Sequence, residues 1–144
     1  MATRSQADLA VALRLAVART ARRLRQEAAA DLSPTQSAAL ATIDGHGPLT
    51  PSELAARERV QRPTMTRLLG RLEEGGLVAR TPDPQDGRSS LVAITPAGRE
   101  LLDRARRRKD AYLAQQLRTL DAEDRATLDR AAVILERLLE EERS

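Results

Sequence analysis

The segment from Thr50 to Thr95 places the strongest constraint on what this chain can fold into. Its residues predict a short helix, a tight turn, a second helix and two short strands joined by a charged connection that contains Pro and Gly. This order is that of a winged helix-turn-helix, in which one helix enters a DNA groove and a β-hairpin lies beside it. The segment therefore predicts a DNA-binding unit.

Length and composition favour one mainly helical domain. The chain has 144 residues, no Phe, Trp or Cys and one Tyr, so its core must be built from Leu, Ala, Val and Ile. The absence of cysteine excludes disulfides, thiol redox sensing and thiolate metal sites. We expect a cytoplasmic protein without a membrane segment, because no stretch is apolar enough for a signal peptide or a membrane span.

Charge is distributed unevenly, although the formal net charge is only +3. Residues 57–72 contain five arginines and one acid, whereas residues 120–144 contain eight acids and four arginines. A basic middle and an acidic tail favour a polyanion bound at one face. The alternative is that arginine is simply the usual surface cation of this chain.

Capping signals predict the helices that precede the strands. An apolar stripe at helical spacing predicts a first helix at about Gln6–Ala30. The letters Ser-Pro-Thr-Gln form a capping box at the start of a helix over Ser33–Asp44, which the sequence Gly-His-Gly-Pro ends. A similar signal, Thr-Pro-Ser-Glu, predicts a short helix over Thr50–Glu58.

The next helix is the candidate recognition helix. It is predicted to start at Gln61–Pro63 and to end at Gly75, with Met65, Leu68, Leu69 and Leu72 as its buried stripe. The opposite face carries the polar residues Gln61, Arg62, Thr64, Thr66, Arg67 and Arg71. Such side chains hydrogen-bond to phosphates and base edges. The alternative is an ordinary amphipathic surface helix.

Two short β-prone runs after this helix, Leu77–Thr81 and Leu91–Thr95, predict an antiparallel hairpin. Its tip reads Pro-Asp-Pro-Gln-Asp-Gly-Arg and ends at Arg88. The tip and the following Leu-Val-Ala-Ile-Thr-Pro-Ala-Gly resemble the wing of the MarR family of bacterial transcription regulators. The resemblance implies that Arg88 reaches into the minor groove and that Asp86 holds it by a charge-assisted hydrogen bond.

The helices that flank this unit have more apolar surface than a small DNA-binding core can cover. Thr95 caps a long helix predicted through about Arg118, and Leu120–Asp124 restarts a final one. We therefore expect a partner chain to cover the first and last helices. The candidate interface residues are Leu9, Leu13, Leu128, Leu135 and Leu138.

The resemblance covers the chain from about Leu9 to Leu139 and implies one domain over residues 1–144. A winged helix-turn-helix lobe at about 33–98 would lie between dimerisation helices at about 6–30 and 99–142. In a two-fold dimer the recognition helices would enter major grooves about 34 Å apart and read a palindromic operator. Phosphate contacts are assigned to Ser52, Arg57, Arg59, Thr64 and Arg71, and base contacts to Gln61, Arg62, Thr66 and Arg67.

The resemblance also implies a small effector, often a phenolic or lipophilic acid, bound between the dimer helices and the DNA-binding lobe. Candidate lining residues are Val17, Leu24, Leu40 and Tyr112, each of which also fits a plain core position. With one aromatic residue in the chain, ring stacking would contribute little.

The sequence does not contain the residues that an enzyme active site would need. His46 is the only histidine and lies between two glycines, without a catalytic set, a phosphate-binding loop or a metal-ligand cluster, so no cofactor or metal is expected. The five cations of Arg104–Lys109 fit a solvated face or pairing with the acidic final helix better than contact with flanking phosphates.

The sequence therefore predicts a DNA-binding transcriptional regulator, a homodimeric repressor modulated by a small ligand. One alternative is a winged-helix adaptor that binds proteins, which would carry an acidic or apolar recognition face. Another is an RNA-binding winged helix, which would display stacking aromatic residues.

Overall fold

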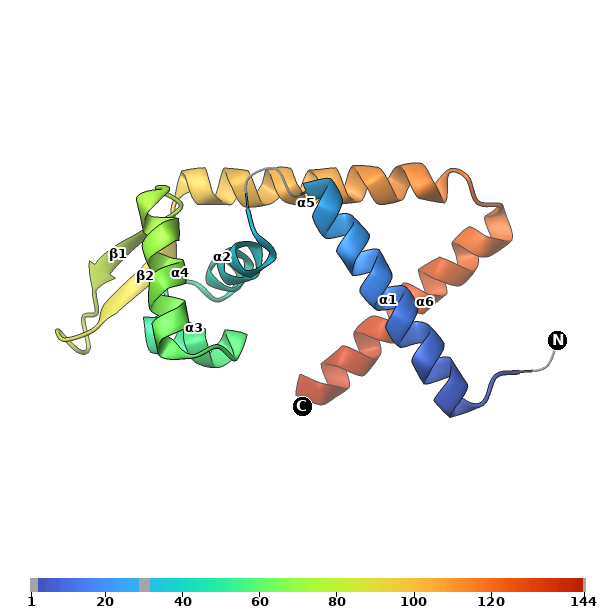
Figure 1. Cartoon of the computed structure of the whole chain (residues 1–144), viewed down its shortest axis with the longest axis horizontal. Helices are drawn as coiled ribbons and strands as arrows, with labels where there is room; N and C mark the ends of the chain where they lie inside the picture. The colour runs from blue at the N-terminus through green and yellow to red at the C-terminus, as the bar shows by residue number, and fades with distance from the viewer. Residues whose placement is uncertain (1–2, 29–31, 144) are drawn as a thin grey trace. The chain divides into compact units, whose positions relative to one another are not determined.

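A computed structural model describes residues 3–28 and 32–143 of the chain. In chain order its elements are α1 (Gln6–Ala28), α2 (Pro34–His46), α3 (Pro51–Glu58), α4 (Arg62–Glu74), β1 (Val78–Pro82), β2 (Ser90–Ile94), α5 (Pro96–Leu117) and α6 (Ala122–Arg143) (Figure 1). The mainly helical fold with a two-stranded wing is confirmed. The predicted end of the first helix, Ala29 and Ala30, lies outside the described residues. Within the described ranges no helix is long and apolar enough to cross a membrane.

Contacts divide the chain into two compact units, Met1–Lys109 and Asp110–Ser144. The core of the first unit lies among α2, α3, α4 and the hairpin. Its largest fully buried side chains are Leu40, Ile43, Leu54, Met65, Leu69, Leu72 and Val92. Leu68, the fourth member of the predicted α4 stripe, is half-buried at the edge of this core. Burial of this stripe orients α4 and leaves its polar face exposed.

The start of α2 follows its capping signal. Gln36 N donates to Ser33 Oγ at 3.2 Å, and Ser33 N donates to Gln36 Oε1 at 2.9 Å, which completes the capping box. The helix was expected to end at about Asp44, and α2 ends two residues later, at His46. Gly45 is tolerated in the last turn, and the chain leaves the helix only at Gly47, whose φ of 73° lies in the left-handed region that favours glycine.

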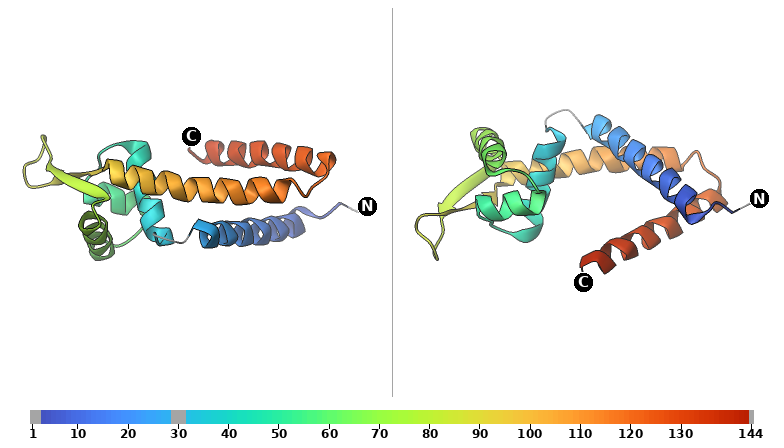
Figure 2. Two further views of the ribbon diagram at one scale, coloured as in Figure 1. Left: turned by 90° about the horizontal axis from the view of Figure 1, so that it is seen from above. Right: turned by 60° about the horizontal axis from the view of Figure 1, so that its bottom comes forward.

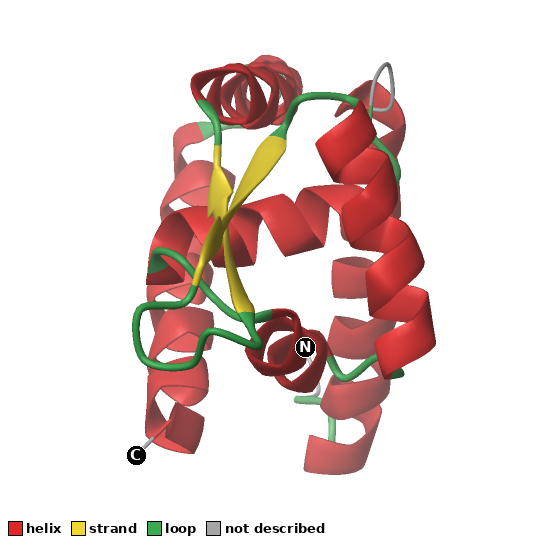
Figure 3. Cartoon of the chain, turned by 90° about the vertical axis from the view of Figure 1, so that its left-hand side faces the viewer, coloured by secondary structure: helices red, strands yellow, loops and turns green. Residues whose placement is uncertain are grey.

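The wing is an antiparallel hairpin with Val78 opposite Ile94 and Pro82 opposite Ser90 (Figure 3). Both strands are displaced by one residue from their predicted spans. At one end Leu77 N still donates to Leu72 O of the α4 terminus at 2.9 Å, so the residue belongs to the turn. The loop between the strands extends past the helices of the first unit (Figure 2).

A short bridge joins the α2–α3 connection to the wing, which the sequence did not indicate. Leu49 pairs with Val92 on β2, with backbone N–O distances of 3.1 and 2.7 Å. Both side chains are buried in the core. The bridge therefore ties the segment that precedes the helix-turn-helix directly to the second strand of the wing.

Thr95 joins the end of α4 to the start of α5. Its Oγ1 accepts from Gly98 N at 3.1 Å, which caps α5 as predicted. The same hydroxyl donates to Gly76 O at 2.6 Å, and Thr95 N donates to Leu77 O at 3.0 Å. One residue thus fixes both the turn after α4 and the first turn of α5.

The second unit contains the end of α5 and all of α6. Asp121 Oδ1 accepts from Asp124 N at 2.8 Å and caps α6. No residue of α6 is buried. Its large exposed apolar side chains are Leu128, Val133, Ile134, Leu138 and Leu139. On α1 the corresponding exposed side chains are Leu9, Val11, Leu13 and Val17. The predicted excess of apolar surface is therefore present on both helices, and the dimer that would cover it stays a prediction.

Candidate nucleic-acid interface

The predicted DNA-contact residues are all exposed, on α3, on α4, in the turn between these helices and in the wing. These exposed residues are Ser52, Arg57, Arg59, Gln61, Arg62, Thr64, Thr66, Arg67, Arg71, Asp86 and Arg88. On α4 the exposed residues are Arg62, Thr64, Thr66, Arg67 and Arg71, whereas Met65, Leu69 and Leu72 are buried. The helix is amphipathic for this reason, and its polar face is free to meet a ligand.

The turn between α3 and α4 depends on Arg59. Its φ of 54° and ψ of 45° place it in the left-handed region, and its N–H donates toward Ala55 O and Ala56 O to close α3. A non-glycine residue in this conformation is uncommon and reverses the chain sharply. The reversal starts α4 within three residues and leaves the Arg59 side chain exposed beside it.

The N-terminus of α4 offers polar groups that the helix does not use for itself. Gln61 is the N-cap, and its side chain makes no capping hydrogen bond. Pro63 lies in the first turn, where its lack of an N–H has no consequence. Thr64 follows, so the first-turn amides of this helix can meet a phosphate together with a hydroxyl. Ser52, the second residue of α3, likewise directly follows a first-turn proline.

Thr66 differs from the other candidate base-reading side chains. Its Oγ1 donates to Arg62 O at 3.0 Å, one turn earlier in α4. The proton of the hydroxyl is therefore engaged within the helix. The methyl group and the oxygen lone pairs remain for DNA, which favours contact with a thymine methyl over hydrogen-bond donation.

His46 contacts a candidate phosphate-binding residue. Its Nε2 lies 3.4 Å from Arg57 Nη1, so the last turn of α2 touches the exposed side of α3. The sequence indicated a solvated turn residue, and His46 is indeed exposed, but it belongs to the helix. The contact joins residues 11 positions apart, and no local sequence signal predicts it.

The wing tip is held by its own acidic side chains. Asp86 Oδ1 accepts from Arg88 N at 3.0 Å, and Asp83 Oδ1 accepts from Gln85 N at 2.9 Å. This bond goes to the Arg88 backbone, and the expected bond from Asp86 to the Arg88 guanidinium stays a prediction. Short acidic side chains commonly stabilise turns in this way. Asp86 thus shapes the loop, while the exposed Arg88 side chain extends from it.

An ion pair that the sequence did not indicate joins the recognition helix to the wing. Arg80 Nε on β1 lies 2.8 Å from Glu73 Oε2 in the last turn of α4. Both side chains are partly exposed. Neither residue was assigned a role in DNA binding, because α-helix and strand periodicities do not show which outward side chains meet in space.

The basic cluster at Arg104–Lys109 is partly neutralised within the first unit. Arg104 Nη2 lies 3.4 Å from Glu100 Oε1, one turn earlier in α5. Arg106 pairs with Asp44 of α2 and Asp103 of α5. Arg106 therefore pairs with α2 and with its own helix. The expected pairing of the cluster with the acidic final helix stays a prediction.

The residues predicted to line an effector pocket are dispersed. A cavity of about 720 Å³ in the first unit is lined by α1, α2 and α5, and Leu24 is one of its residues. Leu40 was assigned wrongly, because it is fully buried in the core and presents no surface to a ligand. Val17 is half exposed on α1, and Tyr112 belongs to the second unit. Throughout the described residues no cluster of His, Asp or Glu could hold a metal ion.

The chain is similar in sequence to a known protein family and to several regulators. A sequence model of the MarR family matches residues 32–90. An HTH-type transcriptional regulator of Mycobacterium leprae is 42% identical over 138 residues, covering 95% of this chain and 96% of that protein. The multiple antibiotic resistance protein MarR of Salmonella typhimurium is 36% identical over 100 residues, 69% of each chain.

Solved structures of transcriptional regulators also have a similar fold. A putative transcriptional regulator of Pseudomonas aeruginosa is 38% identical and superimposes with a TM-score of 0.85, covering 96% of this chain and 98% of that one. A variant of MepR from Staphylococcus aureus, solved with an oligodeoxyribonucleotide, shares the fold with a TM-score of 0.70 at 21% identity, covering 91% of this chain and 97% of that one. The chain therefore belongs to the MarR family of HTH-type transcriptional regulators, which are not enzymes.

Proposed function

We propose that this regulator binds a palindromic DNA operator as a homodimer, with α4 in the major groove and the wing beside it. The observation that carries the proposal is the exposure of the polar side chains of α4 while its apolar stripe is buried, together with the exposed Arg88 of the wing. MepR, which has the same fold, was solved with an oligodeoxyribonucleotide. A protein with this fold can therefore bind DNA.

Each exposed side chain has a role that follows from its position. Phosphate contacts are proposed for Ser52 and Thr64 in the first turns of α3 and α4, for Arg57 and Arg59 at the end of α3, and for Arg71 in the last turn of α4. Base contacts are proposed for Gln61, Arg62, Thr66 and Arg67, with the Thr66 methyl as its reading group. Arg88 enters the minor groove from a loop that Asp86 holds in shape.

The homodimer is supported by the exposed apolar side chains of α1 and α6. Leu9, Leu13, Leu128 and Leu138 are all more than two-fifths exposed, and Leu135 is half-buried. A monomer rarely leaves so many large apolar side chains in water. We propose that residues 1–144 form one domain, in which α1, α6 and the end of α5 make the two-fold interface and residues 33–98 make the DNA-binding lobe.

Repression follows if the operator overlaps a promoter, because a dimer that occupies both half-sites excludes the polymerase. Ligand control is supported by the cavity of about 720 Å³, which lies within the usual size range of small-molecule sites. We propose that a small lipophilic acid in this cavity weakens operator binding.

A salt-titrated binding assay tests the proposed function. The intergenic DNA beside the regulator's own gene is compared with a scrambled duplex of the same composition. We expect dimer-stoichiometric binding to the native duplex, weakened by Arg88→Ala. The matched control is Arg107→Ala, which removes an equally exposed arginine from α5.

The assay also separates the alternatives. Equal weak binding to both duplexes with the same salt slope would leave only nonspecific electrostatics. A duplex selected by the protein from a random library then decides between an operator elsewhere and a protein-binding adaptor. Failure of that selection to enrich any sequence would contradict the proposed function.

A further inference from the structure

His46 ends α2 at a point where side chains of two helices meet. It is the last helical residue before Gly47, and its Nε2 lies 3.4 Å from Arg57 Nη1 in the last turn of α3. Both side chains are exposed. On either side of His46, a β-carbon added to Gly45 or Gly47 would have no atom within 4 Å. The surface around this contact is therefore open to a ligand.

The contact depends on the protonation state of the imidazole. A guanidinium has N–H donors and no acceptor, so Arg57 can donate to His46 Nε2 only while that nitrogen carries no proton. Protonation of His46 places two cations side by side. Histidine is the side-chain type that commonly gains a charge between about pH 8 and pH 5, and the end of a helix favours a cation. A protonated His46 beside Arg57 is therefore a doubly charged site that an anion would stabilise.

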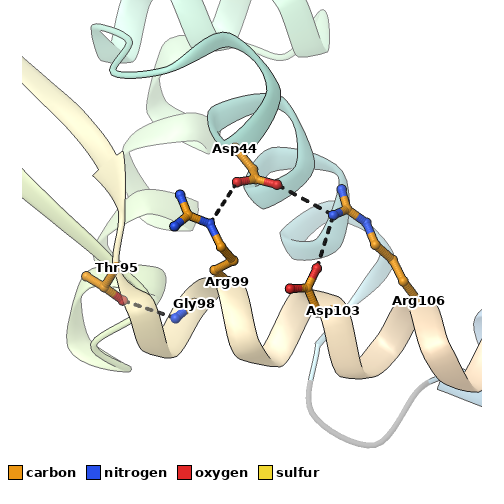
Figure 4. A network of polar contacts seen from close by, with 6 residues as sticks. All are labelled: Asp44, Thr95, Gly98, Arg99, Asp103 and Arg106. Atoms are coloured by element: carbon orange, nitrogen blue, oxygen red, sulfur yellow. Dashed lines mark hydrogen bonds and ion pairs between the residues drawn. The ribbon is translucent and has the colours of Figure 1, made fainter.

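The acidic side chains of the neighbouring elements are held by other partners. On α2, Asp44 pairs with two arginines of α5 at 3.2 and 3.5 Å (Figure 4). On α3, Glu58 accepts from a threonine hydroxyl of α2 at 2.5 Å, and Glu53 accepts from the N-cap threonine of α3 at 3.0 Å. The strand β2, which also packs on α2, has no titratable residue. Within the described residues no carboxylate forms an ion pair with His46 or Arg57.

We propose that His46 and Arg57 together bind one backbone phosphate of the DNA, with His46 protonated in the complex. The inference rests on the proposed function, because it adds the end of α2 to a DNA interface made of α3, α4 and the wing. In the free protein, neutral His46 accepts a hydrogen bond from Arg57. On the duplex, His46 takes up a proton from solvent, and the phosphate accepts charge-assisted hydrogen bonds from both side chains.

Proton uptake fixes the direction of the pH dependence. The complex holds one more proton per protomer than the free protein and duplex do, so DNA affinity rises as the pH falls. By linkage the rise is at most about tenfold per pH unit for each His46. The added charge also displaces a counterion, so the log–log salt dependence of binding should be steeper at low pH, by about one per protomer.

The single histidine of the chain allows the protonation step to be observed directly. The Hε1 and Cε1 resonances of His46 are followed by NMR through a pH titration of the full chain, with and without a duplex of arbitrary sequence at low salt. An operator is not needed, because phosphate contacts do not depend on sequence. With DNA bound, the imidazole should stay protonated to higher pH than in the free protein. The same titration in both states would overturn the inference.

The second experiment measures DNA affinity and its salt slope at about pH 6 and pH 8, on either side of the usual range in which histidine titrates. For a dimer with two sites, the wild type should bind about tenfold more tightly at the lower pH. His46→Gln cannot be protonated and should lose most of this gain and the change in slope. His46→Lys carries a fixed charge and should bind tightly at both pH values.

The matched control keeps one histidine in the chain and moves it. The double variant His46→Gln/Arg107→His carries its imidazole at an exposed position of α5, and it should show no more pH response than His46→Gln alone. Circular dichroism at both pH values checks that each variant folds. A wild-type pH response in this control would overturn the inference.

The shared phosphate is tested by a double-mutant cycle at the lower pH. His46→Gln and Arg57→Gln should each weaken DNA binding, and the variant with both changes should lose less than the two losses combined, because the side chains bind the same group. Losses that simply add would show that the two residues act separately and would overturn the shared site.

Failure of the inference and failure of the proposed function give different results. A pH response that His46→Gln retains in full would overturn the role of His46 and leave the DNA-binding function intact. If the wild type binds no duplex at either pH, the proposed function is contradicted and the inference falls with it.

Discussion

Gly98 packs directly against the carbonyl oxygen of Leu77, so closely that a β-carbon on Gly98 would clash with that oxygen and press on Ile94. Leu77 O also accepts the hydrogen bond from Thr95 N. The start of α5 therefore lies against the turn that links α4 to the wing. Only glycine permits this approach.

Replacement of Gly98 by alanine should destabilise the fold by about 1–3 kcal/mol, because an inserted methyl group forces the backbone apart at a packed contact. Urea unfolding at fixed protein concentration measures the change. Gly70→Ala is the control, since nothing lies within 4 Å of its added β-carbon. That variant should be neutral or up to about 1 kcal/mol more stable, as expected for glycine in a helix interior. Equal effects of the two substitutions would contradict the packing argument.

Loss of the Thr95 hydroxyl should also lower the free energy of unfolding. Thr95→Ala leaves Gly98 N and Gly76 O without their partner, which costs about 1–2 kcal/mol for a helix cap with a second hydrogen bond. Thr95→Ser keeps both bonds and should lose much less. A loss in Thr95→Ser as large as that in Thr95→Ala would show that the methyl group, and not the hydroxyl, stabilises this junction.

The Glu73–Arg80 pair should limit DNA affinity. Glu73→Gln removes an acid from α4 and releases Arg80 toward phosphate, so DNA affinity and the steepness of its salt dependence should both rise, the slope by about one. Because the pair is partly exposed, stability should fall by no more than about 1 kcal/mol. Glu74→Gln makes the same charge change at a neighbouring exposed position. If Glu74→Gln raises the DNA affinity and the salt slope as much as Glu73→Gln does, Arg80 has no part in the effect.

Thr66 should read DNA through its methyl group. Thr66→Val keeps the methyl and removes the hydroxyl, whereas Thr66→Ser does the reverse. We expect Thr66→Val to preserve sequence preference and Thr66→Ser to relax it at one base pair, by at most about 1–3 kcal/mol. Competition with single-base variants of the selected duplex measures this. If Thr66→Ser preserves the sequence preference and Thr66→Val relaxes it, the hydroxyl makes the base contact.

The exposed face of α6 should determine the oligomeric state. Leu138 is 54% exposed in the chain, so Leu138→Glu should leave the monomer folded while placing a charge in the proposed interface. Sedimentation should show a shift toward monomer, and cooperative operator binding should be lost with it. Arg130→Glu, at another exposed α6 position, is the control. An unchanged dimer in Leu138→Glu would place the interface elsewhere.

Capping signals and hydrophobic periodicity were sufficient to predict the order of the elements and most of their boundaries, because both act over a few neighbouring residues. Ser33 with Gln36, and Thr95 with Gly98, form the hydrogen bonds that their spacing predicts. Their partners lie within one helical turn, where chain connectivity fixes the distance. The exposed face of α4 followed in the same way from the spacing of its leucines.

Only the tertiary structure decided which distant side chains meet. The pairs Glu73–Arg80 and Asp44–Arg106 depend on how α4 meets β1 and how α2 meets α5. The close approach of Gly98 to the Leu77 carbonyl and the burial of Leu40 depend on packing in the same way. Periodicity gives the face on which a residue lies, but packing of whole elements sets which faces come together, and no pattern within one segment encodes that.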